Sequence, residues 1–354
     1  MIKLIQRRCW ILVGLIALQF SKLSYASIEA KLLDNSFVIL QYHHVANDTP
    51  AVTSVTDEQF IQHLDLIEQL DMNVVDLADA IDKVRSGEPL PDKSVAITFD
   101  DGYKNIANQA LPELVKRGWP ATVFVNPGLL TQSPSYYLTW PELKHWSKQK
   151  ITIANHGWLH DYWVRENAQN NHQWQQKIKQ SITDTEQAII QHIGYSRKLV
   201  AYPYGEYDTW LQNWLREQKL IAFGQQSGGV AGFSDFTALP RFPASGIYAN
   251  EKTLTTKLLS RVLPVDYTQL PSPIVSTDNN PPSLSFKLLF DKTNQLNCFI
   301  GGKAEMVMEK LADNRFQIKA NQSLDKGRSR YNCTMQSKEA GRFYWLSQSW
   351  LIED

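Results

Sequence analysis

The 354-residue sequence has no excess of charge of either sign, and this lack excludes two classes of partner. Lysine plus arginine and aspartate plus glutamate both number 36, so the formal net charge is zero. Without a basic run, nothing in the chain predicts binding to nucleic acid or to an anionic membrane surface. We find no internal repeat and no low-complexity tract. A neutral or weakly polar partner fits this composition best.

Long hydrophobic runs are also lacking. The apolar run near the N-terminus, Cys9 to Phe20, holds 12 residues, too few to span a bilayer comfortably. Basic residues precede it and small residues at 24–26 follow it, which is typical of a secretory signal cut before Ser27. Cys9 lacks the small-residue context of a lipoprotein cysteine. We therefore expect residues 1–26 to be a signal peptide and the mature protein to be exported, periplasmic or secreted, without stable membrane insertion.

Cysteine is scarce, with three in the chain. Removal of the signal would leave Cys298 and Cys333, 35 positions apart. In an oxidising compartment, two remaining cysteines in one small domain most simply form a disulfide. Two separate buried thiols are the alternative.

What the sequence does contain is a set of metal-ligating residue types. Asp100 and Asp101 are adjacent, and 55 residues beyond Asp101 come His156 and His160, spaced four apart. Two imidazoles with one carboxylate suit Zn²⁺ or a similar divalent ion. The second carboxylate would then be free to act as a general base. Either motif alone is more often a solvated turn, a helix cap or a chance spacing.

The positions of the two motifs favour the functional interpretation. Val95–Phe99 is a short apolar run that predicts a buried parallel strand, and the aspartate pair follows it directly. Ile151–Ala154 predicts a second strand, and His156 lies just beyond it. In barrels of alternating strands and helices, catalytic residues collect at the C-terminal ends of the strands. Both halves of the site are thus expected on one face.

Three motifs in order carry a family resemblance. The segment Ile97–Tyr103, the histidine pair and Tyr202–Gly205 together resemble the polysaccharide deacetylases, the NodB-like carbohydrate esterases. The resemblance covers about residues 37–264. It implies an α/β fold, a distorted (β/α) barrel with fewer than eight strands, and one divalent metal ion, with zinc the first candidate.

The resemblance also implies a role for each matching residue. Asp100 would be the general base, and the metal would be held by Asp101, His156 and His160. The backbone N–H of Tyr204, which follows Pro203, would help to form an oxyanion hole.

Two departures from the common family pattern narrow the assignment. The arginine usually found before the Pro-aromatic pair is missing from Leu199–Tyr202, and no histidine follows His192 to act as general acid. A strand ending in Tyr42-His43-His44 resembles instead the circularly permuted deacetylases of poly-β-1,6-N-acetylglucosamine. That order implies His43 as the acid, with His44 as its neighbour and alternative. A satisfied core histidine is the other interpretation of His43.

The same permuted order implies a partner for the general base. Leu239-Pro240-Arg241 resembles a later Pro-Arg element of those enzymes. Arg241 would then replace the missing arginine and orient Asp100.

The chain is rich in aromatic residues, with 11 tryptophans and 14 tyrosines. Most large aromatics pack in cores. Trp158, Tyr162 and Trp163, however, flank the histidine pair, and we expect them, with His44, to contact the sugar rings of a substrate. Packing inside the protein is the alternative.

Strand and helix patterns alternate through the first part of the chain, which predicts a parallel sheet. Prolines and asparagines cluster at positions 264–282, which is typical of a stiff linker. We expect a catalytic domain over residues 27–264, a linker over 265–282 and a β-rich, sandwich-like accessory domain over 283–354.

The resemblance implies a metal-dependent N-deacetylase acting on an N-acetylhexosamine polysaccharide, most closely poly-β-1,6-N-acetylglucosamine of biofilms. Exopolysaccharide export machinery is then a candidate partner. Three alternatives stay open: a polysaccharide O-acetyl esterase, a non-catalytic carbohydrate-binding protein with the same fold, and a glycoside hydrolase. The last needs two carboxyl groups roughly 5 to 9 Å apart across a sugar, which adjacent aspartates rarely provide.

Overall fold

The computed structural model describes residues 35–165, 170–289, 296–301 and 305–353. The signal peptide predicted for residues 1–26 lies outside this range. In the part of the chain that is described, no helix is both long and apolar enough to cross a membrane.

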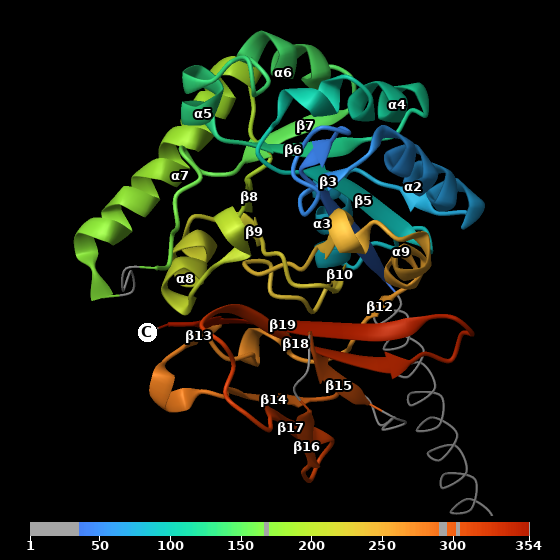
Figure 1. Ribbon diagram of the computed structural model, residues 1–354, viewed down its shortest axis with the longest axis vertical. Coiled ribbons are helices and arrows are strands. Elements are labelled where there is room, and N and C mark those ends of the chain that lie inside the picture. The colour runs from blue at the N-terminus through green and yellow to red at the C-terminus, as the bar shows by residue number, and fades with distance from the viewer. Residues whose placement is uncertain (1–34, 166–169, 290–295, 302–304, 354) are drawn as a thin grey trace, which may run out of the picture.

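The larger body is a barrel wall made of one sheet (Figure 1). Seven strands follow one another in it, in the order β10-β1-β5-β6-β7-β8-β9. Their bounds are β1 Ser36–Tyr42, β5 Ser94–Phe99, β6 Ala121–Val125, β7 Ile151–Asn155, β8 Leu199–Ala201, β9 Ile221–Phe223 and β10 Gly229–Ala231. Two short strands branch from it, β4 (Asn73–Val74) beside β5 and β11 (Phe242–Pro243) beside β1. The predicted distorted α/β barrel with fewer than eight strands along its wall is confirmed.

The strands from β1 to β9 run parallel, and β10 alone pairs antiparallel with β1. Every residue of β5, β6 and β7 is buried, which explains their continuous apolar, β-branched sequences. Because parallel strands end on the same side, the residues after β1, β5, β7 and β8 gather at one edge of the barrel.

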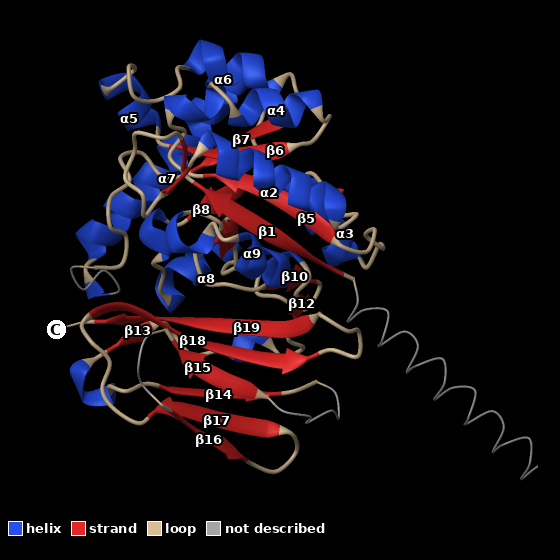
Figure 2. Ribbon diagram, turned by 45° about the vertical axis from the view of Figure 1, so that its right-hand side comes forward, coloured by secondary structure: helices blue, strands red, loops and turns tan. Residues whose placement is uncertain are grey.

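Helices cover the outside of this sheet (Figure 2). They are α2 Asp57–Gln69, α3 Leu77–Ser86, α4 Ala110–Lys116, α5 Pro127–Gln132, α6 Trp140–Ser147, α7 His172–Ile193, α8 Thr209–Glu217 and α9 Glu251–Leu258. The start of α2 shows how local sequence sets an element: Thr56 and Gln59 form a reciprocal capping box. Its buried face then carries Phe60, Leu64 and Ile67 at helical spacing.

The C-terminal part is β-rich, as predicted, and consists of two facing sheets (Figures 1 and 2). One sheet holds β12 Arg261–Val262, β13 Ile274–Val275, β15 Asn297–Ile300, β18 Gly327–Gln336 and β19 Phe343–Ile352. The other holds β14 Ser283–Lys287, β16 Met306–Lys310 and β17 Arg315–Ala320. Side chains of β17 alternate between exposed and buried, and one apolar cluster joins both sheets.

The predicted disulfide is present. Cys298 of β15 and Cys333 of β18 are bonded and stand directly opposite each other in the antiparallel pair. The domain bounds stay a proposal. Residues 265–282 contain β13, which pairs with β19, so this segment packs along the C-terminal sheet.

Candidate metal centre and active site

Three side chains form a compact cluster at the C-terminal edge of the barrel strands. Asp101 follows β5, and His156 and His160 follow β7. Asp101 Oδ1 lies 3.2 Å from His156 Nε2 and 3.4 Å from His160 Nε2. One ligand atom from each of the three lies within 4.8 Å of the others. An Asp-His-His set of this size is a possible binding site for a divalent ion.

The hydrogen bonds around His156 fix which of its nitrogens faces the cluster. Its Nδ1 donates to the backbone carbonyl of Ala201 (2.8 Å), so Nε2 carries a lone pair. Asp101 Oδ1 and His156 Nε2 are both buried, and within the described residues neither has a hydrogen-bond partner. Two lone pairs that face each other in a buried site need a metal ion or a proton between them. The donor set therefore fits a metal ion.

The charges of Asp101 and His160 agree with that fit, whereas at His156 burial would lower the pKa but the neighbouring Asp101 and Asp100 outweigh burial and raise it. Burial would raise the pKa of Asp101, but the neighbouring histidines outweigh burial and hold it well below its usual range. Burial, assisted by His156, lowers the pKa of His160 to about 4. An ionised carboxylate and a neutral imidazole are the forms that bind metals.

Asp100 lies beside this cluster but faces a different group. Arg241 donates from Nη1 to Asp100 Oδ1 (2.6 Å) and from Nη2 to Oδ2 (2.8 Å). Gln41 Nε2 also donates to Oδ2 (2.7 Å). Burial would raise the pKa of Asp100, but the Arg241 guanidinium outweighs it and lowers the pKa to about 2. The contact expected between Arg241 and Asp100 is thus present, and Asp100 is ionised throughout the neutral range.

Backbone geometry marks the same residues. Asp101, His160 and Tyr204 have φ values of 70°, 57° and 59°, in the left-handed region that residues with a Cβ seldom occupy. Such strain persists only where the surrounding structure holds it, and it collects at functional sites. Three of the ten non-glycine residues with positive φ in the described part of the chain thus lie at this site.

The two candidate acids occupy different environments. His43 Nε2 lies 3.9 Å from Asp100 Oδ2, and its side chain is 20% exposed. His44 is buried: its ring stacks on Tyr103 with centroids 3.7 Å apart, and its Nδ1 accepts a hydrogen bond from Asn105 Nδ2 (2.9 Å). His43 therefore faces the open side of the cluster, whereas His44 packs beneath it.

The predicted sugar-contacting aromatics separate into two groups. Trp158 and Tyr162 are 36% and 38% exposed, and Tyr162 stacks on Tyr204 with centroids 3.9 Å apart. The prediction that Trp163 contacts a sugar ring is wrong, because only 1% of this residue is exposed. Its ring packs in an apolar cluster and against Gly157, where an added Cβ would lie 2.5 Å from the ring. Trp163 supports the histidine loop from inside and offers no face to a ligand.

Several residues at the site were not predicted from the sequence. Gln41 is a polar residue inside an otherwise apolar strand, and that was its signal. Asn126 donates from Nδ2 to the carbonyls of His156 (2.6 Å) and Gly157 (3.1 Å) and so holds the histidine loop. The Tyr103 ring stacks on His44 and contacts two further tyrosines, Tyr136 and Tyr137. Position in the fold, which the sequence does not state, brings them here.

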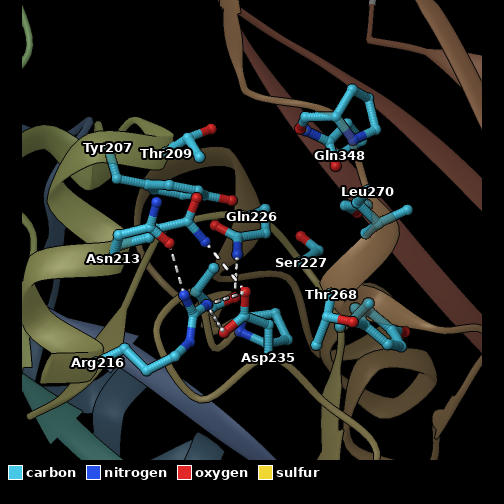
Figure 3. Close-up of a pocket in the computed structure, with 17 residues that line it drawn as sticks. Tyr207, Thr209, Asn213, Arg216, Gln226, Ser227, Asp235, Thr268, Leu270 and Gln348 are labelled. Atoms are coloured by element: carbon cyan, nitrogen blue, oxygen red, sulfur yellow. Dashed lines mark hydrogen bonds and ion pairs between the residues drawn. The ribbon is translucent and has the colours of Figure 1, made fainter. Parts of the chain in front are cut away.

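A separate cavity of about 130 Å³ lies away from this site (Figure 3). Asn213 and Arg216 of α8 line one side, and Leu270 and Gln348 line the other. Arg216 forms an ion pair with Asp235 at 3.3 Å. None of the predicted site residues lines this cavity.

Part of the chain is similar to known proteins. Residues 87–221 match the family model for polysaccharide deacetylases. Over 248 residues the chain is 22% identical to the poly-beta-1,6-N-acetyl-D-glucosamine N-deacetylase of Escherichia coli K12, a match that covers 58% of this chain and 36% of that protein. The chain thus spans about a third of the length of this relative.

Two solved structures share the fold. The Streptococcus pyogenes deacetylase PplD aligns with a TM-score of 0.56 at 19% identity, over 63% of this chain and 98% of PplD. IcaB from Ammonifex degensii aligns with a TM-score of 0.54 at 23% identity, over 62% of this chain and 96% of IcaB. Both alignments leave more than a third of this chain uncovered.

Proposed function

We propose that this chain, which carries a polysaccharide deacetylase domain, removes acetyl groups from the amino sugars of a polysaccharide built of N-acetylhexosamine. Poly-β-1,6-N-acetylglucosamine is the first substrate to test, since a relative with a matching domain is named for it. The observation that carries the proposal is that four side chains of the predicted site meet at one edge of the barrel. The Asp101, His156 and His160 cluster lies there beside a buried, ionised Asp100.

The residues of the chain divide the work of amide hydrolysis. Asp101, His156 and His160 would hold a divalent ion, with zinc favoured by two imidazoles and a carboxylate. When bound, such an ion supplies Lewis-acid polarisation of a carbonyl and lowers the pKa of water. Asp100, ionised and directed by Arg241, takes the proton from water as it adds to the acetyl carbonyl. The Tyr204 N–H donates to the oxyanion that develops.

His43 supports an amide over an ester as the bond that breaks. The leaving nitrogen of an amide must be protonated as the C–N bond cleaves, so a general acid is needed. His43 Nε2 lies 3.9 Å from Asp100 Oδ2, and its side chain is 20% exposed. The C–N bond then breaks: the acetyl group leaves as acetate with the oxygen of the water, and the sugar nitrogen takes the proton from His43 and becomes a free amine.

Export is part of the proposal. A disulfide between Cys298 and Cys333 is typical of proteins in oxidising compartments. The N-terminal sequence pattern points the same way, and a cell-surface or exported polysaccharide would be met there.

The test is acetate release by the purified protein from N-acetylglucosamine oligosaccharides and from O-acetylated xylan fragments. We expect release from the N-acetylated oligomers, loss with a chelator and recovery when zinc is restored. Mass spectrometry would show deacetylated oligomers of unchanged length. Release from the O-acetylated fragments alone would make the protein an esterase, and shortened oligomers would make it a glycoside hydrolase. No release and no metal binding would make it a binding protein.

A further inference from the structure

A groove of about 590 Å³ opens where the barrel meets the C-terminal sheets. Tyr204, Ile247 and Tyr248 line it from the barrel side, and Arg328 and Arg330 line it from β18. The volume is within the range of roughly 300–1,000 Å³ typical of ligand sites. Figures 1 and 2 show β18 and β19 directly below the barrel. The C-terminal region therefore supplies one wall of the groove.

One residue stands between the groove and the metal cluster. Tyr204 lines the groove, and its ring lies 4.5 Å from the ring of His160 and 3.9 Å from that of Tyr162. Only the width of one aromatic ring separates the ligand cluster from the groove. A polymer whose acetyl group is held at the cluster can thus run past Tyr204 into the groove.

The lining offers both contacts that a sugar chain uses. Ile247 is 85% exposed and Tyr248 is 36% exposed, so two apolar faces stand open. The Arg330 guanidinium lies 6.0 Å from the Tyr248 ring centroid. Arg328 Nη1 donates to the Tyr204 carbonyl (2.9 Å) and Arg330 Nη1 to that of Gln225 (3.3 Å). Each guanidinium has five N–H donors, which leaves others available for hydroxyl and acetamide oxygens.

The charges of the groove are unbalanced. Among the described residues that line it, Glu206 is the one acidic residue, set against two arginines. The Glu206 side chain is 3% exposed and accepts two hydrogen bonds from Arg165, at 2.6 and 3.0 Å. Arg328 Nε also lies 3.7 Å from Glu206 Oε1, so this carboxylate is paired with Arg165 and with one arginine of the groove. Arg165, Arg328 and Arg330 together outweigh the one carboxylate, and the charge that a ligand meets is positive. An uncharged acetylated sugar is compatible with that lining, whereas a protonated amino sugar is repelled.

We propose, on the basis of the proposed function, that this groove binds the sugar units next to the unit being deacetylated while they are still acetylated. One wall of the groove comes from β18. Sugar units that have already lost their acetyl group are rejected. The substrate then lies across both parts of the chain, and the C-terminal β region acts as part of the binding site. A product that carries free amines leaves the groove because of its charge.

The experiment uses a blocking variant that keeps the arginines. Ser349 of β19 stands directly opposite Arg330 of β18, on the same face of the sheet, and lines the groove, so Ser349→Trp should fill it. We expect kcat/KM on an N-acetylglucosamine hexamer to fall about tenfold or more, equivalent to about 1.4 kcal/mol, while turnover of a dimer is unchanged. Arg330→Gln is the second variant, and Arg315→Gln, an exposed arginine on β17, is the matched control. Circular dichroism checks the fold of each.

A binding measurement tests the charge preference separately. At pH 6, roughly two units below the pKa of an ordinary α-amino group, the wild-type protein should bind the acetylated hexamer more tightly than its deacetylated form. The preference should shrink in Arg330→Gln and at high salt, and stay unchanged in Arg315→Gln.

Two results would overturn the inference in distinguishable ways. Normal wild-type turnover with unchanged length dependence in both folded groove variants, or equal affinity for the two hexamers, would overturn the groove alone. Absence of acetate release from any oligomer by the wild-type protein would overturn the proposed function and this inference with it.

Discussion

Arg241 and Asp100 form a bidentate ion pair in which both side chains are 0% exposed, although 141 positions separate them in the chain. Arg241 precedes β11, and β11 pairs with β1, whose end lies beside that of β5. The topology thus delivers the guanidinium to the end of the strand that carries the aspartate. This is the contact that the permuted order of the sequence implies for Arg241.

Replacement of Arg241 tests how much of the fold depends on this pair. Arg241→Gln would leave Asp100 as a buried, unpaired carboxylate, so we expect a loss of about 3–5 kcal/mol in the free energy of unfolding. The double variant with Asp100→Asn should be more stable than Arg241→Gln, because the stranded charge is gone. Urea denaturation of both single variants and the double variant measures the coupling. Strictly additive losses would show that the two residues do not act as a pair.

Asp100→Asn tests the proton acceptor. An amide cannot accept the proton from water, so we expect acetate release to fall by about 10² or more while fold and zinc content are kept. Kinetics, circular dichroism and metal analysis measure the three. Asp278→Asn, at an exposed position of the C-terminal part, is the control. Near-normal turnover in Asp100→Asn would remove Asp100 from the mechanism.

His43 and His44 can be separated by the bond that breaks. His43→Ala should impair release from an N-acetylated oligomer strongly but spare an aryl acetate, whose leaving group needs no proton. His44 is buried against Tyr103, so His44→Ala should lower stability and affect both substrates equally. Equal loss on both substrates in His43→Ala would point to a structural role for His43.

The site could be predicted where a motif sits at the end of a strand. Asp101, His156 and His160 were named because apolar runs precede them and their residue types bind metals. The structure brings them within ligand distance. The parallel sheet could be predicted from its alternating strand and helix patterns and from the continuous apolar sequences of its buried strands, whereas its distorted barrel form was implied by the family resemblance.

The sequence did not indicate which aromatic side chains near the histidine pair are exposed. Trp163 and Tyr162 are neighbours in an aromatic segment, yet one is 1% and the other 38% exposed. The difference arises because Gly157 leaves room for the Trp163 ring beneath the loop. The contribution of β18 to the groove was equally hidden, because it depends on how the C-terminal sheets dock below the barrel.

Metal removal should affect stability as well as activity. Any ligand that binds only the folded state stabilises it, by about 2.7 kcal/mol when its free concentration is 100 times Kd. We therefore expect the melting temperature to fall in a chelator and to recover with zinc. In His156→Ala the melting temperature should change little with chelator or zinc, because one of the three metal-binding side chains is lost. The control is His172→Ala, at an exposed position of α7, whose melting temperature should respond as that of the wild type does. A melting temperature that ignores chelator and zinc would contradict the metal centre.

The burial of Lys257 should make the free energy of unfolding depend on pH. Lys257 is 5% exposed, and its Nζ donates to the carbonyl of Pro243 (2.8 Å) and lies 4.5 Å from the Tyr248 ring centroid. Burial, with a smaller effect from Arg330, lowers the pKa of Lys257 from 10.5 to about 7. Below pH 7 the ammonium is buried and charged, which costs on the order of 4 kcal/mol.

The sign follows from proton binding. Between about pH 7 and 10.5 the unfolded chain holds a proton on Lys257 that the folded chain has lost, so stability rises with pH in this window. Lys257→Met removes that term, and its free energy of unfolding should rise less steeply from pH 7 to 9 than that of the wild type. The variant also loses the bond to Pro243, which costs about 1 kcal/mol at every pH. Lys252→Met, on the exposed face of α9, should keep the wild-type slope. Urea denaturation across the pH series decides, because parallel curves for Lys257→Met and the wild type would mean that Lys257 keeps its ordinary pKa in the folded protein.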